Sequence, residues 1–128
     1  MSSAIRFIKK HSLLQAKDLL KAAPFDTTHF AVDDDGVYNV RKDDRGHAIF
    51  NRPNQEWWSL GRVYDCDLYD IQELNSLVEA LELIRNIGDN IHDYIDGELS
   101  NFWMHGLKYS QERIIQAFNL VKAYEISQ

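Results

Sequence analysis

The chain has 128 residues, of which 45% are hydrophobic and 12% aromatic, and this is enough for one domain with a buried core. Its formal net charge of −6 argues against a general nucleic-acid binder, because neutralisation of phosphates supplies most non-specific affinity. The single cysteine, Cys66, excludes an internal disulfide and favours a reducing compartment.

The sequence shows no pattern for export or membrane insertion. Residues 1–6 lack the apolar run of a signal peptide, and no run of about eighteen apolar residues occurs along the chain. We therefore expect a cytoplasmic protein that forms a single domain over residues 1–128.

Residues 4–23 predict two helices separated by a sharp turn. His11 and Ser12 interrupt the apolar pattern, and Ser12 with Gln15 forms the S-x-x-Q pattern that caps a second helix. Pro24 ends this helix, because the residue before a proline is pushed out of the helical region. The two helices carry five Lys or Arg residues and one acidic residue, so a small DNA-binding regulator is one alternative function.

The segment that follows predicts a small antiparallel meander of three to four strands. The expected strands, separated by polar turns, are residues 28–32, 37–41, 47–50 and 56–60. Gly36 suits the first turn, since a residue without Cβ adopts positive φ at no steric cost. With helices before and after the meander, the sequence predicts an α+β fold.

The second half of the chain predicts three helices. Asp70 and Glu73 form a D-x-x-E capping pattern at the start of the most regular apolar stripe, which Gly88 closes. A shorter helix is expected over about residues 90–102, and a last helix begins after Ser110.

Motifs for metal binding and catalysis are incomplete. The acidic turn at residues 33–36 lacks calcium-loop ligands at the first and last loop positions. His92 and Asp96 would supply only two of the four ligands of a structural zinc site, and no H-E-x-x-H, nucleophile elbow or glycine-rich phosphate loop occurs. We predict no catalytic residue, metal or cofactor, with a metal- or cysteine-dependent enzyme as an alternative.

Tryptophans are the first candidates for a binding surface. Trp57 and Trp58 are adjacent in a predicted strand, so their side chains point to opposite faces. One indole then either anchors a partner or packs under the helices. Trp103 is a second candidate, and either patch could also pair two copies of the chain.

Acidic side chains are the second candidates. Asp89, Asp93 and Asp96 follow the i, i+4, i+7 spacing of one helical face. Such a stripe resembles a row of phosphates and would suit a basic groove on a partner, whereas the alternative is an ordinary solvated face.

The segment Phe7–Lys17, followed by Ala23-Pro24 and then Thr28-His29-Phe30, resembles a module of small accessory proteins from bacteriophages and prophages. Ser12 stands where those proteins usually have glycine. Residues 74–88 are similar to another helix of such proteins. Many of these proteins bind and block a host enzyme or defence complex, and the resemblance implies no functional residue.

Together these features predict a phage-type accessory protein that binds and inhibits a bacterial protein or complex. Protein–protein contacts through the tryptophans and aspartates named above would carry the function. We expect neither membrane association nor direct nucleic-acid binding.

Overall fold

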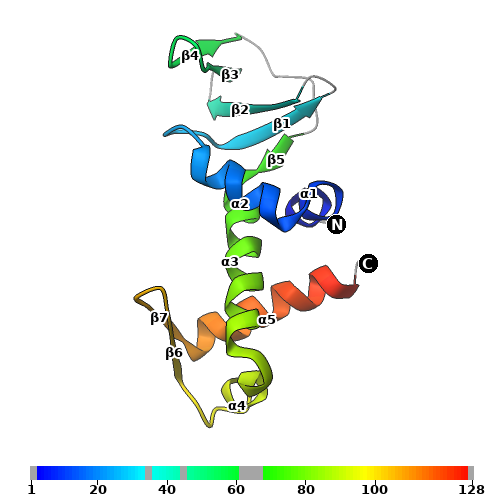
Figure 1. Ribbon diagram of the computed structural model, residues 1–128, viewed down its shortest axis with the longest axis vertical. Helices are drawn as coiled ribbons and strands as arrows, with labels where there is room; N and C mark the ends of the chain where they lie inside the picture. Colours follow the sequence, from blue (N-terminus) through cyan, green and yellow to red (C-terminus); the bar gives the residue numbers. More distant parts are fainter. Residues whose placement is uncertain (1–2, 34–35, 44–45, 61–67, 127–128) are drawn as a thin grey trace. The chain divides into compact units, whose positions relative to one another are not determined.

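The computed structural model describes residues 3–33, 36–43, 46–60 and 68–126 (Figure 1). It divides into two compact units, Ser2–Leu74 and Asn75–Gln128, called here the N-terminal unit and the C-terminal unit. The division falls inside helix α3 (Ile71–Ile87). Helices combined with antiparallel sheets confirm the predicted α+β class, while a single domain over residues 1–128 stays a prediction.

Two short helices begin the N-terminal unit, as predicted: α1 (Ser3–His11) and α2 (Leu13–Ala22). The Oγ of Ser12 accepts a hydrogen bond from the N–H of Gln15 at 3.2 Å, which is the expected cap of α2. Ser12 has φ 110° and ψ 157°, a conformation that essentially only glycine adopts without strain. This residue therefore makes the sharp turn between the helices.

A five-stranded antiparallel sheet completes the N-terminal unit. Its strands are β1 (His29–Asp33), β2 (Gly36–Asp43), β3 (Gly46–Asn51), β4 (Glu56–Ser59) and β5 (Leu68–Asp70). They lie in the order β4-β3-β2-β1-β5. The first four were predicted. The expected maximum of four is wrong because β5 has only three residues, and its pairing with β1 is a long-range contact without a local pattern.

Two hairpins set the register of the sheet. Asp33 pairs with Gly36 at the β1–β2 end, and Asp43 pairs with Gly46 at the β2–β3 end. Gly36 has φ 141°, so its predicted role as the residue that permits the first turn is confirmed. The residues between each pair lie outside the described part of the chain.

Helix α1 packs on one face of this sheet through Phe7. The Phe7 side chain is fully buried, and its ring centroid lies 5.0 Å from that of Tyr69 and 6.3 Å from that of Phe30. Burial of one such side chain contributes roughly 2 kcal/mol. Phe7 thus holds α1 against β5 and β1.

Helix α3 begins as the sequence predicted. Asp70 Oδ1 accepts hydrogen bonds from the N–H groups of Gln72 at 2.8 Å and Glu73 at 3.1 Å. Glu73 makes a different contact from the one a capping box requires: its Oε2 accepts a hydrogen bond from Ser3 Oγ at 2.7 Å. The start of α3 is therefore tied to the start of α1.

The C-terminal unit differs from the predicted structure after Gly88. Gly88 itself has φ 64°, which is consistent with the predicted end of helix α3 at this residue. The unit continues with the 3-10 helix η1 (Gly88–Asn90), α4 (Ile91–Ile95), β6 (Asn101–Met104), β7 (Leu107–Ser110) and α5 (Gln111–Ile126). The helix predicted over residues 90–102 is therefore wrong beyond Ile95. Gly97 has φ 87°, which a right-handed helix does not accommodate, and residues 101–104 pair as a strand instead.

A tight hairpin joins β6 and β7. Met104 pairs with Leu107, and the two residues between them, His105 and Gly106, have φ values of 52° and 77°. Positive φ at both central residues is the signature of a type I′ turn. Helix α5 follows, and the Oγ of Ser110 accepts a hydrogen bond from the N–H of Arg113 at 3.4 Å, as expected for its cap.

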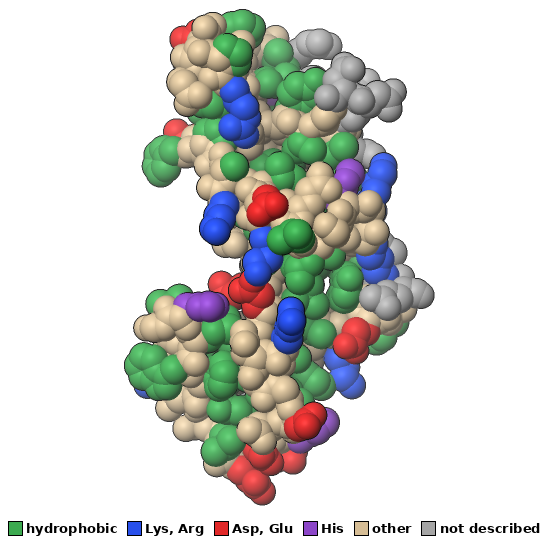
Figure 2. Space-filling view, viewed as in Figure 1, with side chains coloured by type: hydrophobic (Ala, Val, Ile, Leu, Met, Phe, Trp, Pro, Cys, Tyr) green, Lys and Arg blue, Asp and Glu red, His purple; other side chains and the backbone are tan. Residues whose placement is uncertain are grey.

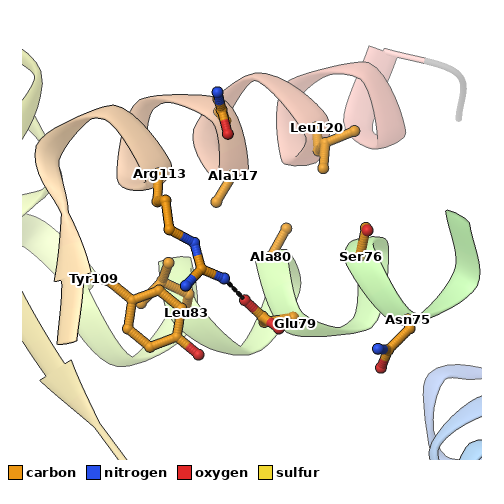
Figure 3. Close-up of a pocket in the computed structure, with 10 residues that line it drawn as sticks. Asn75, Ser76, Glu79, Ala80, Leu83, Tyr109, Arg113, Ala117 and Leu120 are labelled. Carbon is orange, nitrogen blue, oxygen red and sulfur yellow. Dashed lines mark hydrogen bonds and ion pairs between the residues drawn. The ribbon is translucent and has the colours of Figure 1, made fainter. Parts of the chain in front are cut away.

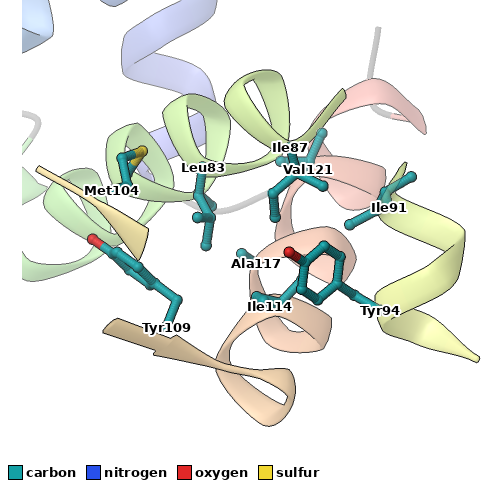
Figure 4. Packing of buried hydrophobic residues seen from close by; sticks show 10 residues of the cluster. Leu83, Ile87, Ile91, Tyr94, Met104, Tyr109, Ile114, Ala117 and Val121 are labelled. Carbon is teal, nitrogen blue, oxygen red and sulfur yellow. The ribbon is translucent and has the colours of Figure 1, made fainter. Parts of the chain in front are cut away.

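The core of the C-terminal unit unites all of its helices and its hairpin (Figure 4). Leu83 and Ile114 are almost completely buried, and Ala117 and Val121 face inward with Ile114. The buried members of this cluster are Ala80, Leu83, Ile87, Ile91, Tyr94, Met104, Tyr109, Ile114, Ala117 and Val121.

Candidate functional site

Trp57 is held against the sheet by its neighbours. It lies opposite Phe50 on β3, with ring centroids 5.2 Å apart and ring planes at 69°. The guanidinium carbon of Arg41 lies 5.2 Å from the Trp57 ring centroid, within the range of a cation–π contact. Trp57 is half-buried and serves mainly to pack β4 onto β3.

Trp58 has the opposite environment, as the alternation of side chains along a strand predicts. Its side chain is 51% exposed and lies opposite Ile49 on the outermost strand of the sheet. The indole Nε1–H donates a hydrogen bond to Glu56 Oε1 at 2.9 Å. This bond restrains the ring, so less side-chain entropy would be lost when a partner covers it.

A pocket of about 370 Å³ lies beside Trp58. This volume is within the usual range for binding pockets, roughly 300–1,000 Å³. Its wall is mostly apolar and aromatic, and Arg52 is its one charged residue among those described. The wall consists of Val37, Tyr38, Asn39, Ile49, Phe50, Asn51, Arg52, Pro53 and Trp58. Trp58 and this pocket are the candidate site.

Trp103, also predicted to bind a partner, is 65% exposed. It lies on β6 opposite Lys108, on the face of the hairpin that points away from the buried Met104 and Tyr109. It belongs to the C-terminal unit, whereas Trp57 and Trp58 belong to the N-terminal unit. Trp103 is therefore a separate candidate surface.

The three aspartates of the predicted stripe lie in a short, irregular segment. Asp89 is in η1, Asp93 is in the five-residue helix α4, and Asp96 ends that helix. Asp89 and Asp96 are exposed, and Asp93 is half-buried. Acidic side chains do gather around the α4 region in Figure 2, but a continuous face of a long helix is not formed. The aspartates lie in the same unit as Trp103.

A second pocket, of about 170 Å³, lies between α3, α5 and the end of β7 (Figure 3). Arg113 Nη2 donates to Glu79 Oε1 at 2.6 Å, and its guanidinium lies 4.6 Å from the ring centroid of Tyr109. Burial raises the pKa of Tyr109, and the Glu79 carboxylate raises it further, while Arg113 opposes this. Ala80, Leu83, Tyr109 and Ala117 line this pocket and also belong to the buried core cluster, so its wall is part of the packing of the C-terminal unit.

Among the described residues, no group of three or more His, Cys, Asp and Glu side chains could hold a metal ion. Cys66 lies outside the described residues, so the cysteine-dependent enzyme stays an alternative. On the face shown in Figure 2, the described Lys and Arg side chains lie singly among neutral and acidic ones.

Six exposed large apolar side chains were missed by the sequence interpretation: Leu14, Phe25, Leu99, Leu107, Leu120 and Ile126. Phe25 is 90% exposed and Leu14 is 69% exposed. The buried residue of α2 is Ala16, and Leu14, two positions away, points to another side of the helix. Phe25 follows the helix-ending Pro24 and has no periodic pattern around it. Exposed apolar residues that occur singly are common on protein surfaces and need no functional explanation.

No protein-family model, curated protein or solved structure matches this chain. Among the described residues, no helix has both the length and the apolar character needed to cross a membrane.

Proposed function

We propose that this protein acts by binding another protein, and that Trp58 and the pocket beside it make the principal contact. The observation that carries the proposal is the half-exposed indole, restrained by Glu56 at the rim of a mostly apolar pocket. Tryptophans in such settings are frequent hot spots of interfaces, because a large apolar area is buried with little loss of side-chain freedom.

The resemblance to phage accessory proteins suggests the kind of partner. We infer that the target is a bacterial protein or defence complex that is inhibited when this protein binds it. The acidic residues near α4 would add electrostatic attraction to a basic partner, which affects the association rate more than the affinity.

The test is affinity purification from bacterial lysate with wild-type protein and with Trp58→Ala as bait. The wild type should retain a specific partner, and Trp58→Ala should weaken binding of that partner at least about tenfold. Once purified, the partner's activity should fall on addition of the wild type but remain unchanged on addition of Trp58→Ala.

Trp103→Ala is the matched control, because Trp103 is similarly exposed but lies in the other unit. Equal recovery by the wild type and Trp58→Ala would contradict the proposed site. Loss of the partner with Trp103→Ala alone would assign the contact to the β6–β7 hairpin instead.

A further inference from the structure

Side chains from one face of the sheet form the pocket beside Trp58. Ile49 pairs with Val40 on β2 and with Trp58 on β4, so these three side chains share a face. Side chains alternate between the two faces along a strand, so Tyr38 and Asn51, two positions further along β2 and β3, lie on this face as well. All but Val40 line the pocket. Three strands therefore present a mostly apolar wall to the same side.

The turn between β3 and β4 places two polar residues in this wall. Asn51 Oδ1 accepts a hydrogen bond from the N–H of Asn54 at 2.9 Å. The Arg52 carbonyl accepts from the N–H of Gln55 at 3.2 Å and from its Nε2 at 2.7 Å. Because the oxygen of the Asn51 amide is used within the turn, its nitrogen is the end that can donate to a bound molecule.

Arg52 is the positive charge of the pocket wall. It is exposed, and no ion pair of this residue occurs among the described residues. Glu56, the acidic residue of β4, is not part of the wall, and its Oε1 accepts the hydrogen bond from the Trp58 indole. A guanidinium presents its donors in a fixed fork that matches a carboxylate. The turn side of the pocket therefore favours a carboxylate beside the apolar wall.

We propose that the pocket binds an aromatic side chain of the partner protein whose neighbouring residue carries a carboxylate. The ring packs against Trp58 in the offset or edge-to-face arrangement that aromatic pairs prefer. The carboxylate pairs with Arg52 and accepts a hydrogen bond from Asn51 Nδ2. This inference deepens the proposed function and rests on it, since it names the feature of the partner that is recognised.

The strength of these contacts decides between a protein segment and a free small molecule. The indole of Trp58 is half exposed, and an exposed ion pair such as that of Arg52 contributes little affinity. One ring and one such pair bind weakly unless a larger interface surrounds them. We therefore assign the ring and the carboxylate to a segment of a protein.

The test uses the acetylated and amidated tetrapeptide Gly-Phe-Asp-Gly, added to uniformly ¹⁵N-labelled full-length protein. Binding should shift the indole N–H resonance of Trp58 and the side-chain amide resonances of Asn51. The indole resonance of Trp103, which lies in the other unit, should not move.

Two control peptides separate the contribution of the ring from that of the carboxylate. Gly-Phe-Asn-Gly keeps the shape without the charge and should bind roughly threefold more weakly. Gly-Ala-Asp-Gly lacks the ring and should bind at least about tenfold more weakly.

Two protein variants form the matched pair. Arg52→Gln should make the Asp and Asn peptides bind equally, because the ion pair is lost. Glu56→Gln removes a negative charge nearby but keeps an acceptor for the Trp58 indole, so it should not weaken binding of the Asp peptide.

Four results would overturn the inference. The first is the absence of a shift at the Trp58 indole up to about millimolar peptide. The second is equal binding of the Asp and Asn peptides to the wild type, which would show that the pocket does not select a carboxylate. The third is tighter binding of phenylacetate than of the peptide, which would indicate a site for a small aromatic acid. The fourth is a concentration-dependent shift of the Trp58 indole without peptide, which would assign the pocket to a second copy of this chain.

The peptide experiment and the lysate experiment fail independently. A partner that is retained through Trp58, but is neither weakened by Arg52→Gln nor displaced by Gly-Phe-Asp-Gly, leaves the proposed function intact and removes this inference. Equal recovery of the partner by Trp58→Ala contradicts the proposed site itself.

Discussion

Ser12 combines two opposing contributions to the free energy of unfolding. Its Oγ caps α2, but its φ of 110° and ψ of 157° cost about 1–3 kcal/mol in a residue with a side chain. Ser12→Gly removes this strain, loses a few tenths of a kcal/mol of capping and slightly increases the entropy of the unfolded chain. We expect the unfolding free energy to rise by about 1 kcal/mol, as measured by urea denaturation.

Ser12→Ala provides the control for this prediction, because it removes the cap and keeps the strain. The unfolding free energy should fall by about 1 kcal/mol. If the glycine variant is less stable than the wild type, the cap rather than the backbone conformation dominates at this position.

The β6–β7 hairpin depends on two residues with positive φ. His105 has φ 52° and is exposed, and left-handed conformations of such residues cost roughly 1–2 kcal/mol unless the residue is Gly, Asn or Asp. Asn-Gly is the preferred pair for a type I′ turn. His105→Asn should therefore raise the unfolding free energy by about 0.5–1 kcal/mol.

His105→Val is the opposite substitution, because a branched Cβ disfavours positive φ strongly. It should lower the unfolding free energy by at least about 1 kcal/mol. Thermal and urea denaturation of the three proteins should rank them Asn, His, Val in decreasing stability. Any other order would contradict the turn assignment.

Elements defined by local chemistry were predictable from the sequence. The cap at Ser12, the cap at Asp70 and the turn glycine Gly36 each involve residues a few positions apart, so a short pattern is sufficient. Strand β5 depends on pairing with β1 across a long stretch of chain, and no short pattern contains that information. The helix predicted over residues 90–102 ends at Ile95, before Gly97 with its positive φ. The β6–β7 hairpin that follows was not predicted, because the positive φ at His105 lacks the usual Asn or Asp signal.

The candidate site could also be predicted only in part from the sequence. Alternation along a strand predicted that Trp57 and Trp58 differ, and the structure assigns the exposed side to Trp58. The pocket beside Trp58 is lined by residues of β2, β3 and β4, which the pairing of these strands brings together. The pocket could therefore not be read from any one segment.

Two histidines of the N-terminal unit couple its stability to pH. Burial lowers the pKa of His11, and Lys10 acts in the same direction. Burial also lowers the pKa of His29, although the Asp70 carboxylate, 3.9 Å away, opposes the shift. In the unfolded chain both should have the ordinary histidine pKa of about 6.5.

A folded-state pKa below the unfolded value means that the folded state binds fewer protons between the two values. The unfolding free energy therefore has its full histidine contribution above about pH 6.5 and falls as the pH decreases below it. Urea denaturation at several values between about pH 7.5 and about pH 5.5 should show this decrease. His11→Gln and His29→Gln should each reduce the decrease, and the double variant should reduce it most. An unchanged slope in the double variant would assign the pH dependence to other groups.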